Sequence, residues 1–429
     1  MDLFSLLAVL IVLSAGFAYL NARYLHLPST IGILLISILF TVTLIIVGRY
    51  VPWILEAATQ MVEQLDFRKI LMDFMLCFLL FAGALHTNFR LLIQYKWPVI
   101  AFATFGVMVS AVLVGILFWG ATGLMGIEID LLTCLVFGAL ISPTDPVAVL
   151  GILKKAKVPK NLEIKIVGES LFNDGIGVVI FLTFLGLAKQ GIEGFEIKET
   201  GLVLLEEIGG GIGLGLFLGY LVYRMLKTID HYETEVLITL AMVIGGYALA
   251  AALGFSGPLA MVVAGLFLGN EKIKTARSHT TEIYLEKFWE LMDVLLNAIL
   301  FVLIGLELLV IDFKAEFLLV GGVAIPIILL VRYVSLGLPV RLFRSRLRFL
   351  PKTGILMTWA GLRGGISIAL ALSLPDELSK DILLSATYFV VVFSILVQGL
   401  TLGPLVKWVM KNEPQEEEGV EDTGKASQH

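Results

Sequence analysis

Two short polar stretches interrupt the apolar runs of this chain: Ile141-Ser142-Pro143-Thr144-Asp145-Pro146 and Gly168-Glu169-Ser170-Leu171-Phe172-Asn173-Asp174-Gly175. A carboxylate at bilayer depth costs about 3 kcal/mol or more, so it usually marks an ion pathway, a proton relay or a buried ion pair. Asp145, Glu169 and Asp174 lie close together in the chain. We interpret the two stretches as the cation site of a secondary transporter.

The composition predicts an integral membrane protein that is surrounded by lipid. The chain is 58% hydrophobic, with a mean hydropathy of +0.94 and only 16% charged residues. A soluble domain carries about 25% charged residues. Apolar stretches of about 20 residues, which is enough to span a bilayer as a helix, recur from end to end. The fold class is therefore all-α, and no cofactor or nucleic-acid partner is expected.

The apolar stretches predict about thirteen transmembrane helices. The ninth is short, and the fifth and twelfth are interrupted, the fifth by prolines and the twelfth by glycines. Their approximate ranges are 3–20, 31–48, 69–85, 97–119, 130–152, 163–188, 201–224, 234–253, 256–270, 288–309, 316–339, 353–374 and 383–410.

The distribution of basic residues predicts the orientation. Connections that follow an even-numbered span, counted with the end residues of the flanking spans, hold seven of the 31 Lys and Arg residues, and those that follow an odd-numbered span hold nineteen. Basic loops stay in the cytoplasm. The N-terminus is therefore expected outside and the C-terminus in the cytoplasm. For a prokaryotic chain this places a multi-pass protein in the plasma (inner) membrane.

The two interrupted spans predict an inverted repeat. Spans 5 and 12 are seven spans apart, and an odd offset reverses orientation, so spans 4–6 and 11–13 would be inverted copies. Paired interruptions in two halves of a transporter point to its binding site. We expect residues 1–410 to form one transmembrane domain, and residues 411–429 to form a short acidic tail that is disordered.

The first polar stretch breaks its helix because proline lacks a backbone N–H. Pro143 and Pro146 deprive two carbonyls of their helical partners, and a residue before proline is pushed out of the α region. Thr144 and Asp145 should then lie in an extended crossing whose carbonyls can bind a cation. The alternative is a simple proline kink in which Asp145 caps the next half-helix.

The second stretch places its polar groups on one face of a helix. Glu169 and Asn173 are four residues apart, as are Ser170 and Asp174, and the two rows adjoin. Asp174, Ser170 and a carbonyl near Thr144 offer the hard oxygen ligands that suit Na⁺ or Li⁺. The amide of Asn173 would orient Asp174 or Asp145. The alternative is a polar seam between helices.

Two arginines lie within predicted spans and need partners. Arg332 is in span 11, and Arg363 lies in the glycine-rich interruption of span 12. We favour Arg332 as the partner of Glu169, because a buried arginine needs a carboxylate or carbonyls. Arg363 would then neutralise half-helix carbonyls at the span-12 break. The alternative is that both arginine side chains extend to the interface between membrane and water.

These motifs resemble the monovalent cation:proton antiporter family, in its NhaP-like and sodium/proton exchanger branch. The resemblance covers nearly the whole membrane region. It rests on four words: Ser142-Pro143-Thr144-Asp145-Pro146, Gly168-Glu169-Ser170-Leu171-Phe172-Asn173-Asp174-Gly175, Leu362-Arg363-Gly364-Gly365 and Asn297-Ala298-Ile299-Leu300-Phe301-Val302-Leu303-Ile304-Gly305.

The resemblance implies the sodium/proton antiporter fold and a homodimer working by alternating access. A mobile six-helix core, at about 97–188 and 316–410, would move against a dimerisation scaffold. Asp174 would be the essential carboxylate, with Thr144, Asp145, Ser170 and Glu169 around the ion. Many members carry an acid near Ala82, which is apolar here.

The predicted function is Na⁺/H⁺ (or Li⁺/H⁺) antiport, with a role in pH and sodium homeostasis, and not an enzyme activity. Asp174 would bind either Na⁺ or H⁺, which couples the two fluxes. A K⁺/H⁺ or broader cation exchanger is the alternative within transport. A cation channel or a membrane sensor is the alternative of another class, because broken helices around charged groups also suit a pore.

Overall fold

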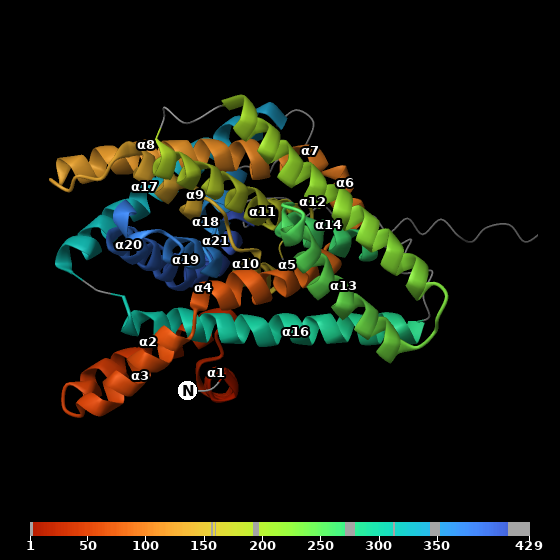
Figure 1. The fold of residues 1–429 in the computed structure, drawn as a ribbon, viewed down its shortest axis with the longest axis horizontal. Coiled ribbons are helices and arrows are strands. Elements are labelled where there is room, and N and C mark those ends of the chain that lie inside the picture. Colours follow the sequence, from red (N-terminus) through yellow and green to blue (C-terminus); the bar gives the residue numbers. More distant parts are fainter. Residues whose placement is uncertain are drawn as a thin grey trace, which may run out of the picture.

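The computed structural model describes residues 3–155, 158, 160–191, 197–270, 279–311, 314–343 and 352–410, and these form an all-helical bundle (Figure 1). Two predicted features lie partly or wholly outside the described residues: the acidic tail at 411–429 and the basic loop between spans 11 and 12.

The first half of the bundle begins with two long helices, continues mainly with shorter segments and ends with α11, the longest helix in the described part of the chain. Its helices, with π-helical turns marked η, are α1 (Leu3–Leu20), η1 (Asn21–Leu25), α2 (Ser29–Gly48), α3 (Pro52–Gln64), α4 (Phe67–Lys69), η2 (Ile70–Met75), α5 (Leu76–Leu85), α6 (Phe89–Gln94), α7 (Lys96–Ala101), η3 (Phe102–Gly106), α8 (Val107–Leu124), α9 (Leu131–Ile141), α10 (Pro146–Lys155) and α11 (Lys160–Gln190).

The second half contains the longest helices after α11. They are α12 (Ile197–Leu226), α13 (Tyr232–Ala252), α14 (Gly257–Leu268), α16 (His279–Leu306), the 3₁₀ turn η5 (Glu307–Leu309), α17 (Ala315–Phe343), α18 (Thr353–Ala360), α19 (Gly365–Leu372), the 3₁₀ turn η6 (Asp376–Leu378), α20 (Lys380–Phe393), the π-helical turn η7 (Ser394–Gln398) and α21 (Gly399–Met410).

Each predicted span coincides with helix in the described residues. Nine helices there are long and apolar enough to cross a membrane, and the bent pair α18–α19 makes ten. Two more apolar helices, α9 and α14, are shorter. The protein is thus a multi-span membrane protein, and the count of thirteen stays a prediction. Helix α3 was not among the predicted spans, because Glu56 and Glu63 interrupt its apolar character.

Both predicted interruptions are present. Helix α9 ends at Ile141 and α10 begins at Pro146, while α18 and α19 are separated at 361–364 and bent by 55°. One detail of the prediction is wrong: Ser142 keeps α-helical dihedrals (φ −76°, ψ −33°) although it precedes a proline. Its hydroxyl donates to the Gly138 carbonyl at 2.7 Å, which continues the helical turn by one residue.

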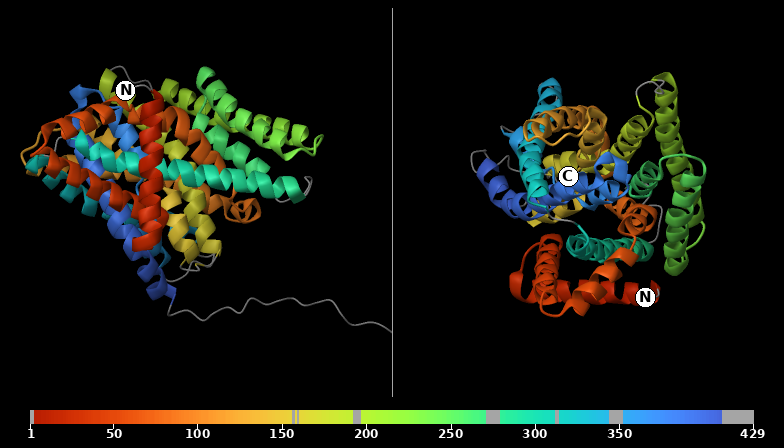
Figure 2. Two further views of the ribbon diagram at one scale, coloured as in Figure 1. Left: turned by 90° about the horizontal axis from the view of Figure 1, so that it is seen from below. Right: turned by 60° about the vertical axis from the view of Figure 1, so that its left-hand side comes forward.

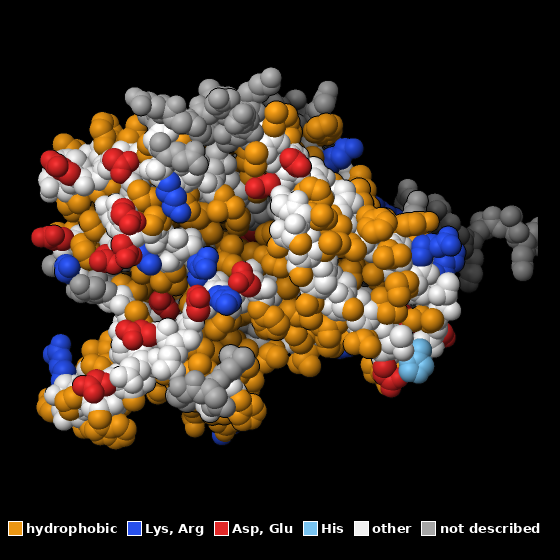
Figure 3. Space-filling view, viewed as in Figure 1, with side chains coloured by type: hydrophobic (Ala, Val, Ile, Leu, Met, Phe, Trp, Pro, Cys, Tyr) orange, Lys and Arg blue, Asp and Glu red, His pale blue; other side chains and the backbone are white. Residues whose placement is uncertain are grey.

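The interrupted helices lie in the middle of the bundle. Figure 1 shows α16 along one side and α8 along the opposite side, with α18–α21 between them, and the right-hand view of Figure 2 has the same order. Hydrophobic side chains cover much of the face in Figure 3, as expected for a protein in lipid. The charged side chains on that face gather mainly toward its left half and right edge.

Glycines let α8 and α9 approach closely next to the first break. A side chain at Gly138 would collide with the Ala111 carbonyl oxygen and would lie 2.9 Å from the Gly115 backbone nitrogen. A side chain at Gly115 would lie 2.8 Å from the Leu135 Cα atom. Small residues at a helix interface let backbones meet in this way. The contact holds the start of the broken span against α8.

We expect Gly138→Ala to lower the free energy of unfolding by about 1–3 kcal/mol, because the added methyl group must push α8 and α9 apart. The measurement is the melting temperature in detergent. Gly120→Ala is the matched control, since nothing lies within 4 Å of a side chain built at Gly120 in α8. Equal melting temperatures for the two variants would contradict the close packing.

Candidate functional site: an acid-lined cavity at two helix breaks

The two helix breaks are bonded directly to each other. The backbone N–H of Asp145 donates to the Leu362 carbonyl at 2.7 Å. In the opposite direction, Nη1 of Arg363 donates to the Pro143 carbonyl at 2.9 Å and, in a shorter contact, to the Ser142 carbonyl. These bonds join two segments far apart in the chain into one unit.

The position of Arg363 differs from the prediction. It was expected to neutralise carbonyls at its own break, and instead it serves the end of α9. The physical reason is that Pro146 has no N–H for the Ser142 carbonyl and that Pro143 lies past the end of α9, so both carbonyls lack helical partners at the negative end of a half-helix dipole. Arg363 is 2% exposed, so it needs such acceptors in place of water.

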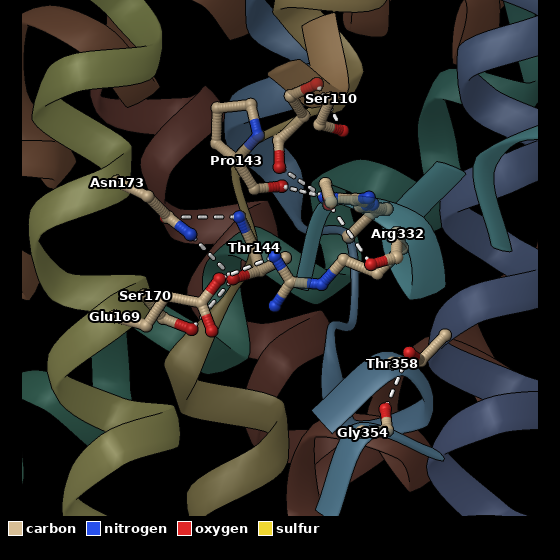
Figure 4. Close-up of polar contacts among 12 residues, drawn as sticks. Ser110, Pro143, Thr144, Glu169, Ser170, Asn173, Arg332, Gly354 and Thr358 are labelled. Carbon is tan, nitrogen blue, oxygen red and sulfur yellow. Dashed lines mark hydrogen bonds and ion pairs between the residues drawn. The ribbon is translucent and has the colours of Figure 1, made fainter. Parts of the chain in front are cut away.

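Helix α11 holds Thr144 from the side (Figure 4). The Asn173 Oδ1 atom accepts from the Thr144 backbone N–H at 3.2 Å, and Asn173 Nδ2 donates to the Thr144 hydroxyl at 2.8 Å. The Ser170 hydroxyl is also 2.8 Å from the Thr144 hydroxyl. The prediction that Asn173 orients Asp174 or Asp145 is therefore wrong, because both ends of its amide bond Thr144.

Glu169 points toward α17 and pairs with Arg332, as predicted. The distance between Glu169 Oε1 and Arg332 Nη1 is 2.5 Å, and the two side chains are 1% and 4% exposed. Arg332 Nε has no hydrogen-bond partner among the described residues. The pair brings α11 and α17 together and neutralises both charges.

A cavity lies beside the breaks. Of the predicted ion ligands, the structure places Thr144, Asp145 and Asp174 on its wall. Ser170 and Asn173 lie behind Thr144, and Glu169 is taken up by Arg332. Leucines from η2, α5 and α11 supply most of the apolar wall.

The site contains polar residues that were not among the predicted site residues. Ser367 in the first turn of α19 lines the cavity. Two further serines support the breaks: Ser394 accepts from the Arg363 backbone N–H at 2.9 Å, and Ser110 lies 3.0 Å from the Ser142 hydroxyl. Single serines occur throughout membrane helices and do not by themselves indicate a site. Only Ser367 could have been found from the sequence, because it lies just after the glycine-rich break.

The arrangement can bind a small hard cation. Asp145 and Asp174 supply two carboxylates, and Thr144 and Ser367 supply neutral oxygens near the same cavity. Oxygen ligands of this kind suit hard cations, and a carboxylate can also take up a proton. The site therefore has the ligands for both a cation and a proton.

The chain matches the transmembrane sodium/hydrogen exchanger family over residues 9–408. It belongs to this family. It is 46% identical over 418 residues to the Na(+)/H(+) antiporter NhaP of Pseudomonas aeruginosa, which covers 96% of this chain and 98% of that relative. It is 32% identical over 414 residues to the Na(+)/H(+) antiporter NhaH of Halobacillus dabanensis, with 95% and 98% covered.

A solved structure has the same fold. The sodium proton antiporter MjNhaP1 from Methanocaldococcus jannaschii at pH 8 matches with a TM-score of 0.72 at 21% identity, over 96% of this chain and 99% of that one. The predicted family is thereby confirmed as a transporter family, and so is an all-helical multi-span fold like that of MjNhaP1, whereas the inverted repeat stays a prediction.

We expect Glu169→Gln to lower the melting temperature more than Asp174→Asn does. Removing one partner leaves the charge of Arg332 buried and uncompensated, at a cost of about 3–5 kcal/mol. The double variant Glu169→Gln, Arg332→Gln should regain part of the loss, because it buries no lone charge. Equal melting temperatures for Glu169→Gln and Asp174→Asn would argue against the stabilising role of the pair.

Proposed function

We propose that this chain exchanges Na⁺ or Li⁺ for H⁺ by alternating access. The observation that carries the proposal is the position of Asp145 and Asp174 on one cavity, beside two bonded helix breaks. The names of the similar proteins, which are Na⁺/H⁺ antiporters, point the same way. The physiological role would be pH and sodium homeostasis.

In the proposed cycle, Asp174 carries either the cation or the proton. Its side chain is 4% exposed and lines the cavity, so a lone negative charge there lacks full hydration. Binding of Na⁺ or of H⁺ relieves that cost, and one carboxylate cannot hold both. Asp145, Thr144 and Ser170 would complete the Na⁺ site, and Asn173 would hold Thr144 in place.

We further propose a homodimer of thirteen-span subunits with the N-terminus outside. The excess of basic residues in odd-numbered connections supports this orientation. The core at about 97–188 and 316–410 would move against the remaining spans, which would form the dimerisation scaffold. For a prokaryotic chain the location would be the plasma membrane.

A K⁺/H⁺ or broader cation exchanger is the second candidate. Oxygen ligands alone do not select among the monovalent cations, and the same two carboxylates would serve. Antiport measured in proteoliposomes with Li⁺, Na⁺ and K⁺ separates the candidates. A cation channel would conduct Na⁺ without moving protons in the same assay.

We expect Asp174→Asn to abolish Na⁺-driven proton movement in proteoliposomes, while the protein still inserts and keeps its oligomeric state. The amide can neither carry a proton nor offer a charged ligand. Asp66→Asn is the matched control, because Asp66 is an exposed N-cap of α4 and asparagine caps a helix equally well. Exchange retained in Asp174→Asn would refute the role of this carboxylate.

We expect the exchange to be electroneutral, with one Na⁺ for one H⁺. Glu169 is paired with Arg332, and position 173 carries an amide that cannot titrate, so Asp174 is left as the carrier. The measurement is the exchange rate in proteoliposomes with the membrane potential clamped at several values. A strong dependence on potential, or a sodium-driven current, would refute the one-for-one exchange, and Asp145 is the carboxylate that could then carry a second proton.

A further inference from the structure

A buried amide lies on the same cavity as the two carboxylates. Asn297 belongs to α16, is 5% exposed, and lines the cavity that Asp145 and Asp174 also line. The carboxylates come from the first break and from α11, whereas Asn297 comes from the long helix on one side of the bundle (Figure 1). The cavity is thus polar on more than one wall.

The orientation of the Asn297 amide is determined by its neighbour one turn earlier. Its Nδ2 atom donates to the Asp293 backbone carbonyl at 2.8 Å and to Asp293 Oδ1 at 3.0 Å. Both of these atoms are acceptors, so the amide nitrogen and not the oxygen must face them. The amide oxygen is therefore directed away from Asp293 by two hydrogen bonds.

The amide oxygen itself is buried and has no hydrogen-bond partner among the described residues. A buried acceptor without a partner costs stability, and such groups in native structures call for an explanation. Asn297 is part of the cavity wall, and a cation bound in the cavity could be the missing partner of this oxygen. The unsatisfied amide oxygen would then be a ligand that is occupied only while a cation is bound in the cavity.

Packing holds Asn297 close to the second break. Leu300, one turn further along α16, also lines the cavity, and a side chain built on Gly365 would lie 2.6 Å from Leu300 Cδ1. Since Gly365 begins α19, the face of α16 with Asn297 and Leu300 abuts the break that bonds to Asp145. The amide is therefore on a helix that lines the same cavity as the carboxylates.

We propose that Asn297 Oδ1 is a ligand of the transported cation in this cavity. A dehydrated monovalent cation needs several oxygen ligands, and amide oxygens serve hard cations alongside carboxylates. The amide adds a ligand without adding a charge or a titrating group, so the exchange of one cation for one proton is preserved. This inference rests on the proposed cation/proton exchange and adds a ligand from α16, outside the proposed moving core.

The test is the KM for Na⁺ and for Li⁺ of reconstituted variants in proteoliposomes. We expect Asn297→Ala to raise the KM about tenfold with little change in the maximal rate, as for the loss of one neutral polar contact. In detergent, the rise in melting temperature on adding Na⁺ should shrink for the same variant. Thr41→Val is the matched control: Thr41 is fully buried in α2, its hydroxyl lacks a partner among the described residues, and it does not line the cavity.

Asn297→Asp separates a ligand from a structural hydrogen bond. A carboxylate loses the hydrogen bonds to Asp293 but keeps an oxygen for the cation and adds a negative charge that attracts it, so a ligand role predicts a KM well below that of Asn297→Ala. A purely structural role predicts that Asn297→Asp behaves like Asn297→Ala. This variant decides the question even if Asn297→Ala fails to fold.

The outcomes distinguish this inference from the proposed function. A wild type that moves no protons in response to Na⁺, Li⁺ or K⁺ would refute the exchange itself. A wild type that exchanges, with Asn297→Ala showing an unchanged KM and an unchanged Na⁺-dependent melting shift, would overturn the ligand role of Asn297. A KM of Asn297→Asp as high as that of Asn297→Ala would overturn it as well.

Discussion

The missing N–H groups of Pro143 and Pro146 are the constraint on which the site depends. They leave carbonyls at the end of α9 without helical partners, in surroundings where water cannot replace them. Arg363 donates from the second break to the Ser142 carbonyl, which Pro146 leaves without a helical partner, and also to the Pro143 carbonyl, and the Asp145 N–H returns a bond to the Leu362 carbonyl. Each break therefore satisfies the other, which explains why irregular backbone is stable in the middle of the bundle.

The same constraint separates the charges of the site by function. Arg363 is occupied by carbonyl dipoles, and Arg332 is occupied by Glu169 at 2.5 Å. The Glu169 pair therefore adds no net charge to the centre of the bundle. Asp145 and Asp174 line the cavity instead, where their charge can act on a mobile cation. The charges of the buried pair and the carboxylates on the cavity thus have separate roles.

The sequence predicted those features that depend on local chemistry. Prolines and glycines located both breaks, the helical period located the polar face of α11, and the need of a buried arginine for a carboxylate located the Glu169–Arg332 pair. The actual partners of Arg363 and Asn173 were predicted wrongly. Their choice depends on how closely α11, α18 and the end of α9 approach, and that distance is decided by packing such as the close approach of Gly177 in α11 to the Pro143 ring rather than by spacing along the chain.

The contacts of Thr144 show how a segment without helical hydrogen bonds can line a cavity and still be held in place by side chains. Asn173 bonds its backbone N–H and its hydroxyl at once, and Ser170 lies at hydrogen-bond distance from the same hydroxyl. An asparagine spans both atoms because its amide carries a donor and an acceptor on one planar group. An aspartate at 173 could accept from the N–H but could not, when ionised, donate to the hydroxyl. The amide at position 173 therefore has a structural role, because it holds Thr144 in its conformation, and it also adds no charge to the site.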